Sequence, residues 1–425
     1  MTIYEFQELY PTKESKAEAA KGLTDAELDC LIDSAHNVQA KILYSRFKKK
    51  NQLVRYSGKY NEIARNVIRY FLQSGNENIV LSPFSIIMLL TIITDSVAGD
   101  TQQEILDVLG GDLSFEDYRK MLREFQSMLT ESTSEDRNGH CYIRRGNVVF
   151  SNAVCVLNDI LKSINPDYEE RLGWYHGRLF GSDNLVEDVN SWVDEQTKGM
   201  IPQMLDEPLK DVMVCLLNAI AFEAQWEEQY DKYDVKSGKF NNADGSLSEV
   251  KMLHGTEGRF VNKVGFKGFI KPYKDRKYSF MALLPDRRGP EALKKVLKSA
   301  DFTDLFMTAG HGMIRTVMPE YSYDYDCDLS SLCMDLGMQT VFSPAADFSP
   351  MSSEWLKLEL ILHKAHIEVD RNGTKAAAAT AGILYIGCGA PNDEIKEVRL
   401  DRPFVYAIMH NETGLPVFVG VVNKL

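Results

Sequence analysis

Few residues of this chain stand at the spacing that catalysis requires. Ser82 and His363 could act as nucleophile and base, but no Gly-x-Ser-x-Gly elbow supplies the oxyanion-binding amides that such a pair needs. Cys388 is a second candidate nucleophile, although an inert loop thiol is the simpler interpretation. The eight histidines form no spaced metal-ligand set, and no phosphate loop or dinucleotide loop occurs. We therefore expect no catalytic and no metal-binding residue, and the protein is predicted not to be an enzyme.

The most unusual feature of the sequence is a tract of small residues that follows a predicted strand ending at Val369. Composition alone favours a short helical turn for its alanines. The alternation indicates something else, because in an extended conformation one face would carry only small side chains and Lys375 would lie on the opposite face. Such a strand could enter a sheet between existing strands without steric conflict. The positions on the face with only small side chains are Thr374, Ala376, Ala378, Thr380 and Gly382.

Composition argues against several classes of protein. The chain has 425 residues, with 48 Lys and Arg against 61 Asp and Glu, so its formal charge is −13. This balance disfavours a nucleic-acid-binding or basic membrane-binding protein, and no run of 18 apolar residues indicates a membrane span. The seven cysteines are widely spaced and odd in number, so a disulfide framework is not expected and a reducing compartment is mildly favoured. Residues 1–6 lack the basic and apolar regions of a signal peptide.

The order of predicted elements favours an α+β fold. Residues 1–58 are polar and are expected to form an N-terminal extension, helical or partly disordered, with an amphipathic helix over 25–47 that ends at a basic run. A second helix is predicted over 60–73. Mixed helices come first and many short strands later, which indicates one large domain over residues 59–425. The clearest strands are predicted at 212–222, 404–409 and 417–422.

Six motifs, in order along residues 60–425, resemble those of the serpin family of serine protease inhibitors. The most specific is the stretch 398–408, which fits the family signature throughout. The strand 363–369, followed by Gly373-Thr374 and the alanines, resembles the strand and hinge that lead into the family's reactive loop. The other four matches lie at 78–86, 190–201, 217–226 and 346–349. On these residues the sequence is similar to an arthropod-like inhibitory serpin.

The resemblance implies the serpin fold, with three β-sheets, about eight or nine helices and an exposed reactive loop near residues 371–397. It also implies a suicide-substrate inhibitor. The protease attacks the loop, forms an acyl-enzyme, and is carried along as the cut loop inserts into the central sheet, so that its triad is distorted. The partner would be a serine or cysteine endopeptidase in a covalent complex, and the inhibitor a monomer. The alternative is a non-inhibitory relative that acts as a binding or storage protein.

The family's spacing places the reactive bond between Gly387 and Cys388, with Ile386-Gly387 as the alternative. No Lys or Arg lies between Lys375 and Lys396, which favours an elastase-like or subtilisin-like serine protease, or a papain-like cysteine protease, over a trypsin-like one. The hinge residues that the resemblance implies are Gly373, Thr374, Lys375, Ala376, Ala377, Ala378, Ala379 and Thr380. The shutter and breach residues, which have a structural role, are Ser82, Ser85, Asn218, Trp226 and His363. Of these, the two serines, the asparagine and the histidine are expected to share hydrogen bonds under the central sheet, because buried polar groups need partners.

Some features depart from the family pattern or leave alternatives open. Arg371 and Asn372 stand where acidic residues usually precede the hinge, and a glycan on the sequon at Asn372 would obstruct entry into the sheet. We expect no cofactor. A basic set that could bind a sulfated polysaccharide is more simply a solvated face, and it comprises Lys263, Lys267, Lys271, Lys274, Arg276 and Lys277. The resemblance favours an extracellular location, and the lack of a signal peptide makes the cytoplasm the alternative.

Overall fold

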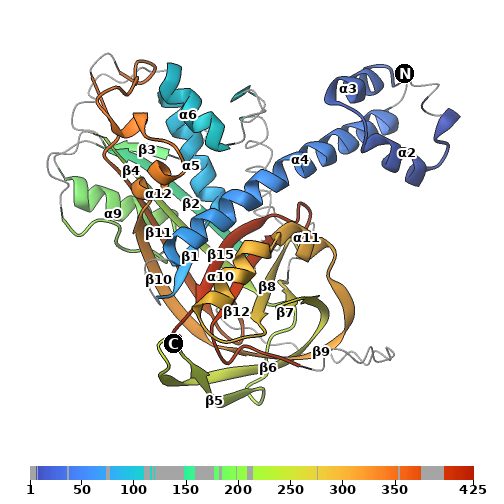
Figure 1. Cartoon of the computed structure of the whole chain (residues 1–425), viewed down its shortest axis with the longest axis vertical. Helices are drawn as coiled ribbons and strands as arrows, with labels where there is room; N and C mark the ends of the chain where they lie inside the picture. Colours follow the sequence, from blue (N-terminus) through green and yellow to red (C-terminus); the bar gives the residue numbers. More distant parts are fainter. Residues whose placement is uncertain are drawn as a thin grey trace. The chain divides into compact units, whose positions relative to one another are not determined.

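A computed structural model describes residues 6–72, 77–109, 148–157, 177–180, 184–207, 214–374 and 397–425, apart from residues 7, 36, 37, 198, 275, 353 and 354, and also residues 115, 116 and 119. The chain divides into two compact units, residues 1–60 and residues 61–425. The division falls inside one long helix, α4 (Val38–Leu72). Figure 1 gives the elements and their labels.

The first unit is helical and has an apolar core of its own. Helices α2 (Lys13–Ala20) and α3 (Asp25–Asp33) each begin with a capping box. The side chain of a threonine accepts from the backbone N–H of the residue three positions later, and the side chain of that residue accepts from the backbone N–H of the threonine. Leu28 and Leu31 of α3 are buried in the same cluster as Tyr44 and Phe47 of α4. The unit therefore closes an apolar core between its own helices.

The single helix predicted over 25–47 is wrong, because the chain forms two helices there. α3 ends at Asp33 and α4 begins at Val38. Two helices can fold onto each other and bury the apolar stripe that one continuous helix would leave in water. The basic run does not end α4 either: Lys48 Nζ bonds to Asp29 Oδ1 of α3 at 2.6 Å, and the helix continues to Leu72.

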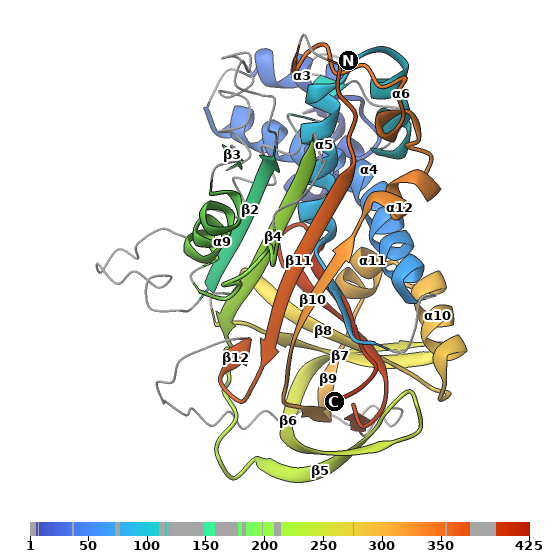
Figure 2. The same ribbon diagram turned by 90° about the vertical axis from the view of Figure 1, so that its left-hand side faces the viewer.

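The second unit contains a six-stranded sheet with the order β10-β11-β12-β4-β2-β3 (Figure 2). Strand β4 is almost wholly buried, because α9 (Leu185–Gln196) packs Val189, Trp192 and Val193 against it. The apolar helix α5 (Pro83–Ser96) is buried along its whole length. The strands of this sheet are β2 (Val148–Leu157), β3 (Gly177–Phe180), β4 (Cys215–Gln225), β10 (Tyr321–Asp328), β11 (Leu360–Val369) and β12 (Gly373–Thr374).

A nine-stranded sheet holds the rest of the described strands, in the order β1-β15-β14-β8-β7-β6-β9-β13 with β5 beside β6. Its C-terminal part is the predicted antiparallel hairpin of β14 and β15. The strands are β1 (Ile79–Leu81), β5 (Val235–Asn241), β6 (Leu247–Lys263), β7 (Phe266–Pro272), β8 (Tyr278–Pro285), β9 (Gly310–Pro319), β13 (Glu397–Arg399), β14 (Phe404–His410) and β15 (Pro416–Val422). The other helices are α6 (Gly99–Leu109), α10 (Pro290–Ser299), α11 (Phe302–Met307) and α12 (Ser330–Asp335).

The α+β class predicted from the order of elements is confirmed. In the described part of the chain the strands hydrogen-bond into two sheets, where three were expected. The reason is the 17-residue strand β6, which pairs with β5 over one part and with β7 over another. Its pairing with β9 has a register shift near Glu257. Two groups of strands are thereby joined into one sheet. Within the described ranges no helix is long and apolar enough to cross a lipid bilayer.

Close backbone packing in this sheet gives a first prediction. A Cβ added to Gly268 of β7 would lie 2.1 Å from the carbonyl oxygen of Ala282 on β8, whereas one added to Gly258 of β6 would meet nothing within 4 Å. We expect Gly268→Ala to destabilise the protein by about 1–3 kcal/mol through overpacking, and Gly258→Ala to have little effect. Thermal unfolding of the two variants beside the parent measures this. Equal melting temperatures would contradict the register of β7 and β8.

Candidate functional site

The six-stranded sheet contains a fork. Strands β4 and β11 are parallel neighbours over seven residue pairs, from Leu360 with Cys215 to His366 with Ala221. Beyond that point the short strand β12 lies between them, where it pairs antiparallel with both (Figure 2). The chain that follows Thr374 therefore starts from the middle of a sheet and not from its edge.

The two residues of β12 fit the fork closely. A Cβ on Gly373 would lie 2.1 Å from the carbonyl oxygen of Ala224, so only glycine allows the backbone to approach β4 this closely. Thr374 is fully buried, and its hydroxyl lies 2.7 Å from the hydroxyl of Tyr273. The side chain of Thr374 thus marks the face of β12 that points into the molecule.

A three-residue turn, residues 370–372 and called here the hinge turn, connects β11 to β12. Asp370 shapes it, because its Oδ1 accepts hydrogen bonds from the backbone N–H groups of Asn372 (2.7 Å) and Gly373 (3.0 Å). The three carbonyl groups of the turn also have donors. Trp226 Nε1 bonds to Asp370 O (2.9 Å), Tyr230 N to Arg371 O (3.0 Å) and Trp226 N to Asn372 O (2.9 Å). Every carbonyl of the hinge turn is therefore held by the segment that follows β4.

Sequence reasoning named Trp226 but missed Asp370, Tyr230 and Tyr273. For Asp370 a signal was present, since an aspartate followed two and three positions later by Asn and Gly is typical of an Asx turn. Nothing local marks the two tyrosines, because their contacts with the hinge span more than 100 residues of sequence.

The four polar residues expected under the sheet lie close together and are fully buried. Asn218 Oδ1 of β4 accepts from Ser85 Oγ of α5 and from His363 Nδ1 of β11, both at 2.7 Å. Ser82 Oγ donates to the carbonyl of Val417 at 2.8 Å and caps α5 by accepting from Ser85 N. The structure thus does not pair Ser82 with His363 as nucleophile and base. Instead, Asn218 links α5, β4 and β11 through hydrogen bonds.

Comparison with known proteins agrees with this geometry. The family model described as serpin (serine protease inhibitor) matches residues 59–425. The chain belongs to the serpin family. Serpin-ZX of Arabidopsis thaliana is 28% identical over 387 residues, covering 85% of this chain and 96% of the relative, and Serpin B6 of Macaca fascicularis is 27% identical over 381 residues, covering 84% and 96%.

Solved structures confirm the serpin fold. The native state of the thermophilic serpin tengpin is 30% identical and has a TM-score of 0.74, covering 86% of this chain and 94% of that one. The latent state of the same serpin is 27% identical and has a TM-score of 0.69, covering 87% and 98%. The family is one of protease inhibitors and not of catalysts.

The remaining predicted site residues of this serpin lie outside the described residues. These are the hinge positions Lys375, Ala376, Ala377, Ala378, Ala379 and Thr380 and the reactive-bond positions Ile386, Gly387 and Cys388. What the structure describes is the anchor of this segment at each end: β12 on one side and β13 on the other.

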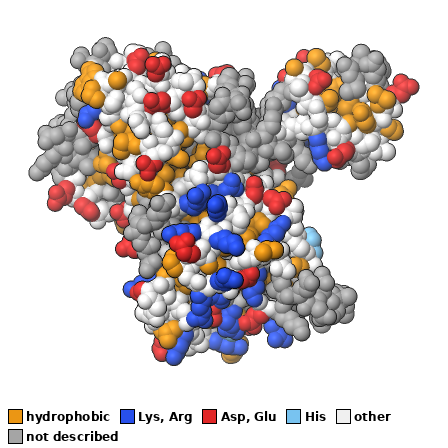
Figure 3. Space-filling view, in the orientation of Figure 1, with side chains coloured by type: hydrophobic (Ala, Val, Ile, Leu, Met, Phe, Trp, Pro, Cys, Tyr) orange, Lys and Arg blue, Asp and Glu red, His pale blue; other side chains and the backbone are white. Residues whose placement is uncertain are grey.

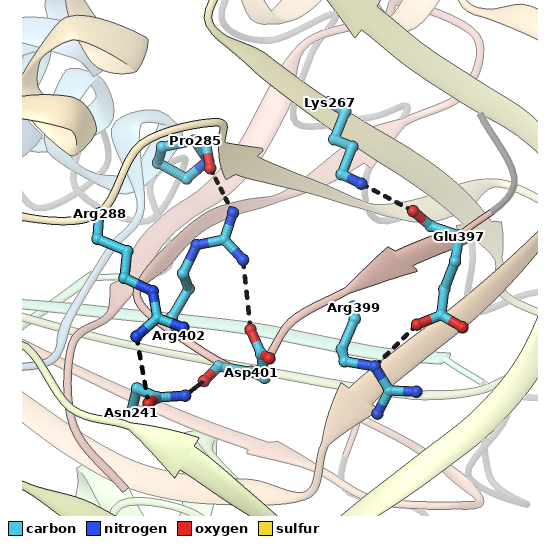
Figure 4. A network of polar contacts seen from close by, with 8 residues as sticks. All are labelled: Asn241, Lys267, Pro285, Arg288, Glu397, Arg399, Asp401 and Arg402. Atoms are coloured by element: carbon cyan, nitrogen blue, oxygen red, sulfur yellow. Dashed lines mark hydrogen bonds and ion pairs between the residues drawn. The ribbon is translucent and has the colours of Figure 1, made fainter. Parts of the chain in front are cut away.

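The second anchor joins the nine-stranded sheet (Figure 4). Strand β13 pairs with β9 over only three residues, and Lys267 Nζ donates to the carbonyl of Glu397 at 2.9 Å. Just beyond β13, Asn241 binds the carbonyl of Asp401 with its backbone N–H (2.8 Å) and its side-chain amide (2.9 Å). Arg402 Nη2 donates to the carbonyl of Pro285 at 2.8 Å. The side chains of Lys267 and Asn241, and the bond from Arg402 to the end of β8, therefore reinforce a very short ladder.

The expectation of one solvated basic face is wrong for Lys271, whereas Lys263, Lys274 and Arg276 are exposed. The side chain of Lys271 is only 4% exposed and is bound to Glu257, while Lys263 faces Asp304 and Arg276 pairs with Glu227. Figure 3 shows Lys and Arg gathered elsewhere, over α10. A hollow of about 400 Å³ there is lined by Arg69, Glu291, Lys294, Lys295 and Lys298.

The sequon at Asn372 falls in the hinge turn, and its amide nitrogen is already in use. Asn372 Nδ2 donates to Asp370 Oδ2 at 2.9 Å, and the carbonyl of Asn372 binds Trp226. A glycan would replace one of the two hydrogens on this nitrogen and place bulk beside β12. The hinge turn therefore leaves little room for modification of Asn372.

The buried histidine gives the second prediction. Burial lowers the pKa of His363 to about 3. Above about pH 6.5 the residue is neutral in both the folded and the unfolded chain; below it only the unfolded chain takes up the proton, so stability falls as the pH drops. When the pH drops from 7 to 5, this effect should lower the free energy of unfolding of the parent by about 2 kcal/mol. His363→Gln lacks the histidine and should not show this loss. Urea unfolding at the two pH values measures this, and an identical loss in both proteins would contradict a neutral, buried His363.

Proposed function

We propose that this serpin inhibits an endopeptidase as a suicide substrate, with the segment after Thr374 becoming a new strand of the six-stranded sheet. The observation that carries the proposal is β12, which already lies between β4 and β11 with Thr374 facing inward. Because side chains alternate along a strand, a continuation of β12 would bring positions 376, 378, 380 and 382 to the same face. The sequence has only Ala, Thr and Gly at these positions.

Hydrogen bonding favours the inserted form. A strand that continues from β12 would run antiparallel to both neighbours, as β12 does. Insertion would exchange the one parallel ladder between β4 and β11 for two antiparallel ladders. Parallel pairing is slightly less stable per residue than antiparallel pairing, so both the number and the kind of ladder favour insertion. The uncut chain is held back because its other end is anchored by β13. Cutting the segment between the two anchors would remove that restraint, so the cleaved form is the more stable one.

The chemistry needs no catalytic group on the inhibitor. The hydroxyl or thiol of the protease attacks the carbonyl carbon of Gly387, the bond to the nitrogen of Cys388 breaks, and that nitrogen leaves as a free amine after taking up a proton. The inhibitor is now joined to the protease as an ester or thioester. Insertion then moves the acylated end away from β13 and distorts the triad before water can hydrolyse the bond.

The side chains around the bond define the target class. Since no Lys or Arg lies between Lys375 and Lys396, a pocket for a basic residue would remain empty. Gly387 suits the small pocket of elastase-like enzymes, and Ile386 suits papain-like and subtilisin-like enzymes that accept an apolar side chain. We therefore assign the target to these classes.

The third prediction tests the reaction itself. Mixed with elastase, subtilisin or a cathepsin-type cysteine protease, the parent should form a complex with at least one of them that survives denaturing electrophoresis, and the clipped inhibitor should melt at a higher temperature than the intact one. Mass spectrometry should locate the cut at 387–388 or 386–387, and a cut outside 384–390 would refute that assignment. Complete turnover of the inhibitor by all three proteases, with unchanged melting, would favour the non-inhibitory alternative.

A matched pair of substitutions tests the alternation and is the fourth prediction. In Ala376→Arg the new charge would fall on the face of Thr374 and would have to be buried without a partner, which costs several kcal/mol. In Ala377→Arg the same charge would fall on the other face. We expect the first variant to be cleaved as a substrate with little or no stable complex, and the second to form the complex. Equal behaviour of the two variants on denaturing gels would exclude an inserted strand in which position 376 shares the buried face of Thr374.

A further inference from the structure

A buried ion pair lies next to the hinge. Lys271 of β7 and Glu257 of β6 approach to 2.8 Å, and their side chains are only 4% and 6% exposed. Burial by itself would lower the pKa of Lys271, but the carboxylate of Glu257 raises it above the ordinary value, so the ammonium keeps its charge. An ion pair removed from water in this way is weak evidence for added stability, because desolvation offsets the attraction. Its presence therefore calls for another explanation.

The ammonium group of Lys271 contacts two aromatic rings. Its Nζ lies 4.5 Å from the centre of the Tyr230 ring and 5.5 Å from the centre of the Trp226 ring, both within the range of a cation–π interaction. Trp226 also stacks on Tyr273, with ring centres 4.6 Å apart and planes at 10°. All three rings are buried. The cation and Tyr273 thus leave the indole little freedom to turn.

The same three aromatic residues bind the hinge. Trp226 and Tyr230 donate to the carbonyls of the hinge turn, and Tyr273 bonds to the hydroxyl of Thr374. A tilt of the indole would break the bond from Nε1 to Asp370 O. The orientation of the hinge is therefore connected, through two rings, to the charge on Lys271.

We propose that Lys271, with Glu257 as its counter-ion, is a positioning residue that holds Trp226 and Tyr230 in the arrangement that seats β12, so that insertion starts without delay once the loop is cut. The kinetic part of this assignment rests on the proposed function. Insertion competes with hydrolysis of the acyl-enzyme. If the hinge is not already in position, insertion is slower, and a larger fraction of the inhibitor is released as cleaved substrate.

Exchanging the two charged residues distinguishes the effect of the cation–π contacts from the effect of the ion pair. The double variant Lys271→Glu with Glu257→Lys keeps two opposite charges but moves the ammonium from β7 to β6. A second variant, Lys271→Met with Glu257→Gln, removes both charges and avoids leaving a single buried one. Lys271→Arg keeps a cation at the same place and should restore parental behaviour. The control exchanges Lys294 and Glu291, an exposed pair on α10.

The first readout is the number of inhibitor molecules consumed for each protease molecule trapped. Loss of a cation–π contact should raise this number about three- to tenfold in the exchange and charge-free variants, while the rate at which the loop is first attacked stays unchanged. Lys271→Arg and the control should match the parent. A lower melting temperature with an unchanged number would show a merely structural role and would overturn the proposal.

The second readout needs no protease. Hydrogen exchange followed by mass spectrometry reports the protection of the backbone amides of Trp226 and Tyr230, which bind the hinge turn. We expect these amides to exchange about tenfold faster in the exchange and charge-free variants, with no change in β14 and β15. Unchanged protection at the hinge would overturn the proposal. If the parent traps none of the proteases, the proposed function fails, and this experiment still decides whether Lys271 positions the hinge.

Discussion

The need to pair every backbone group in the middle of a sheet governs this structure. Strands β4 and β11 satisfy each other as far as Ala221, and beyond that point the inner edges of both require a new partner. β12 supplies it for two residues, and the carbonyls of the hinge turn are satisfied by Trp226 and Tyr230. β12 therefore occupies only the end of the space between β4 and β11, in a position from which a longer insert could extend.

The groups that resist this extension are polar and buried. Asn218 connects β4 to β11 and to α5 through single hydrogen bonds, and opening the sheet must break or rearrange them. Each buried hydrogen bond of this kind adds only modestly to the free energy of unfolding, but leaving one of its partners buried without a hydrogen bond costs more than the bond contributes. They make the closed sheet well defined without making it deeply stable, which suits the rearrangement that the proposed insertion requires.

Fold alone does not decide between an inhibitor and a carrier. Uncleaved ovalbumin and thyroxine-binding globulin share this fold, with TM-scores of 0.72 and 0.71, but at 22% and 21% identity they carry no functional argument for this chain. The features on which the proposed inhibition rests are local: a glycine that fits the backbone of β4, a threonine whose hydroxyl meets Tyr273, and the small residues that the sequence places after them.

The amino-acid sequence by itself determined the elements whose signals are local. Ser82-Pro83 begins α5, the apolar runs near the C-terminus form a hairpin, and the α+β class follows from the order of patterns. Tertiary structure decided the rest. The helix predicted over 25–47 divides because its apolar stripe is buried by folding back, and Lys271 is buried because both faces of β7 are covered, which removes the alternation that marks an exposed residue. The hinge contacts join segments more than 100 residues apart, and only the packed sheets bring such segments within hydrogen-bonding distance.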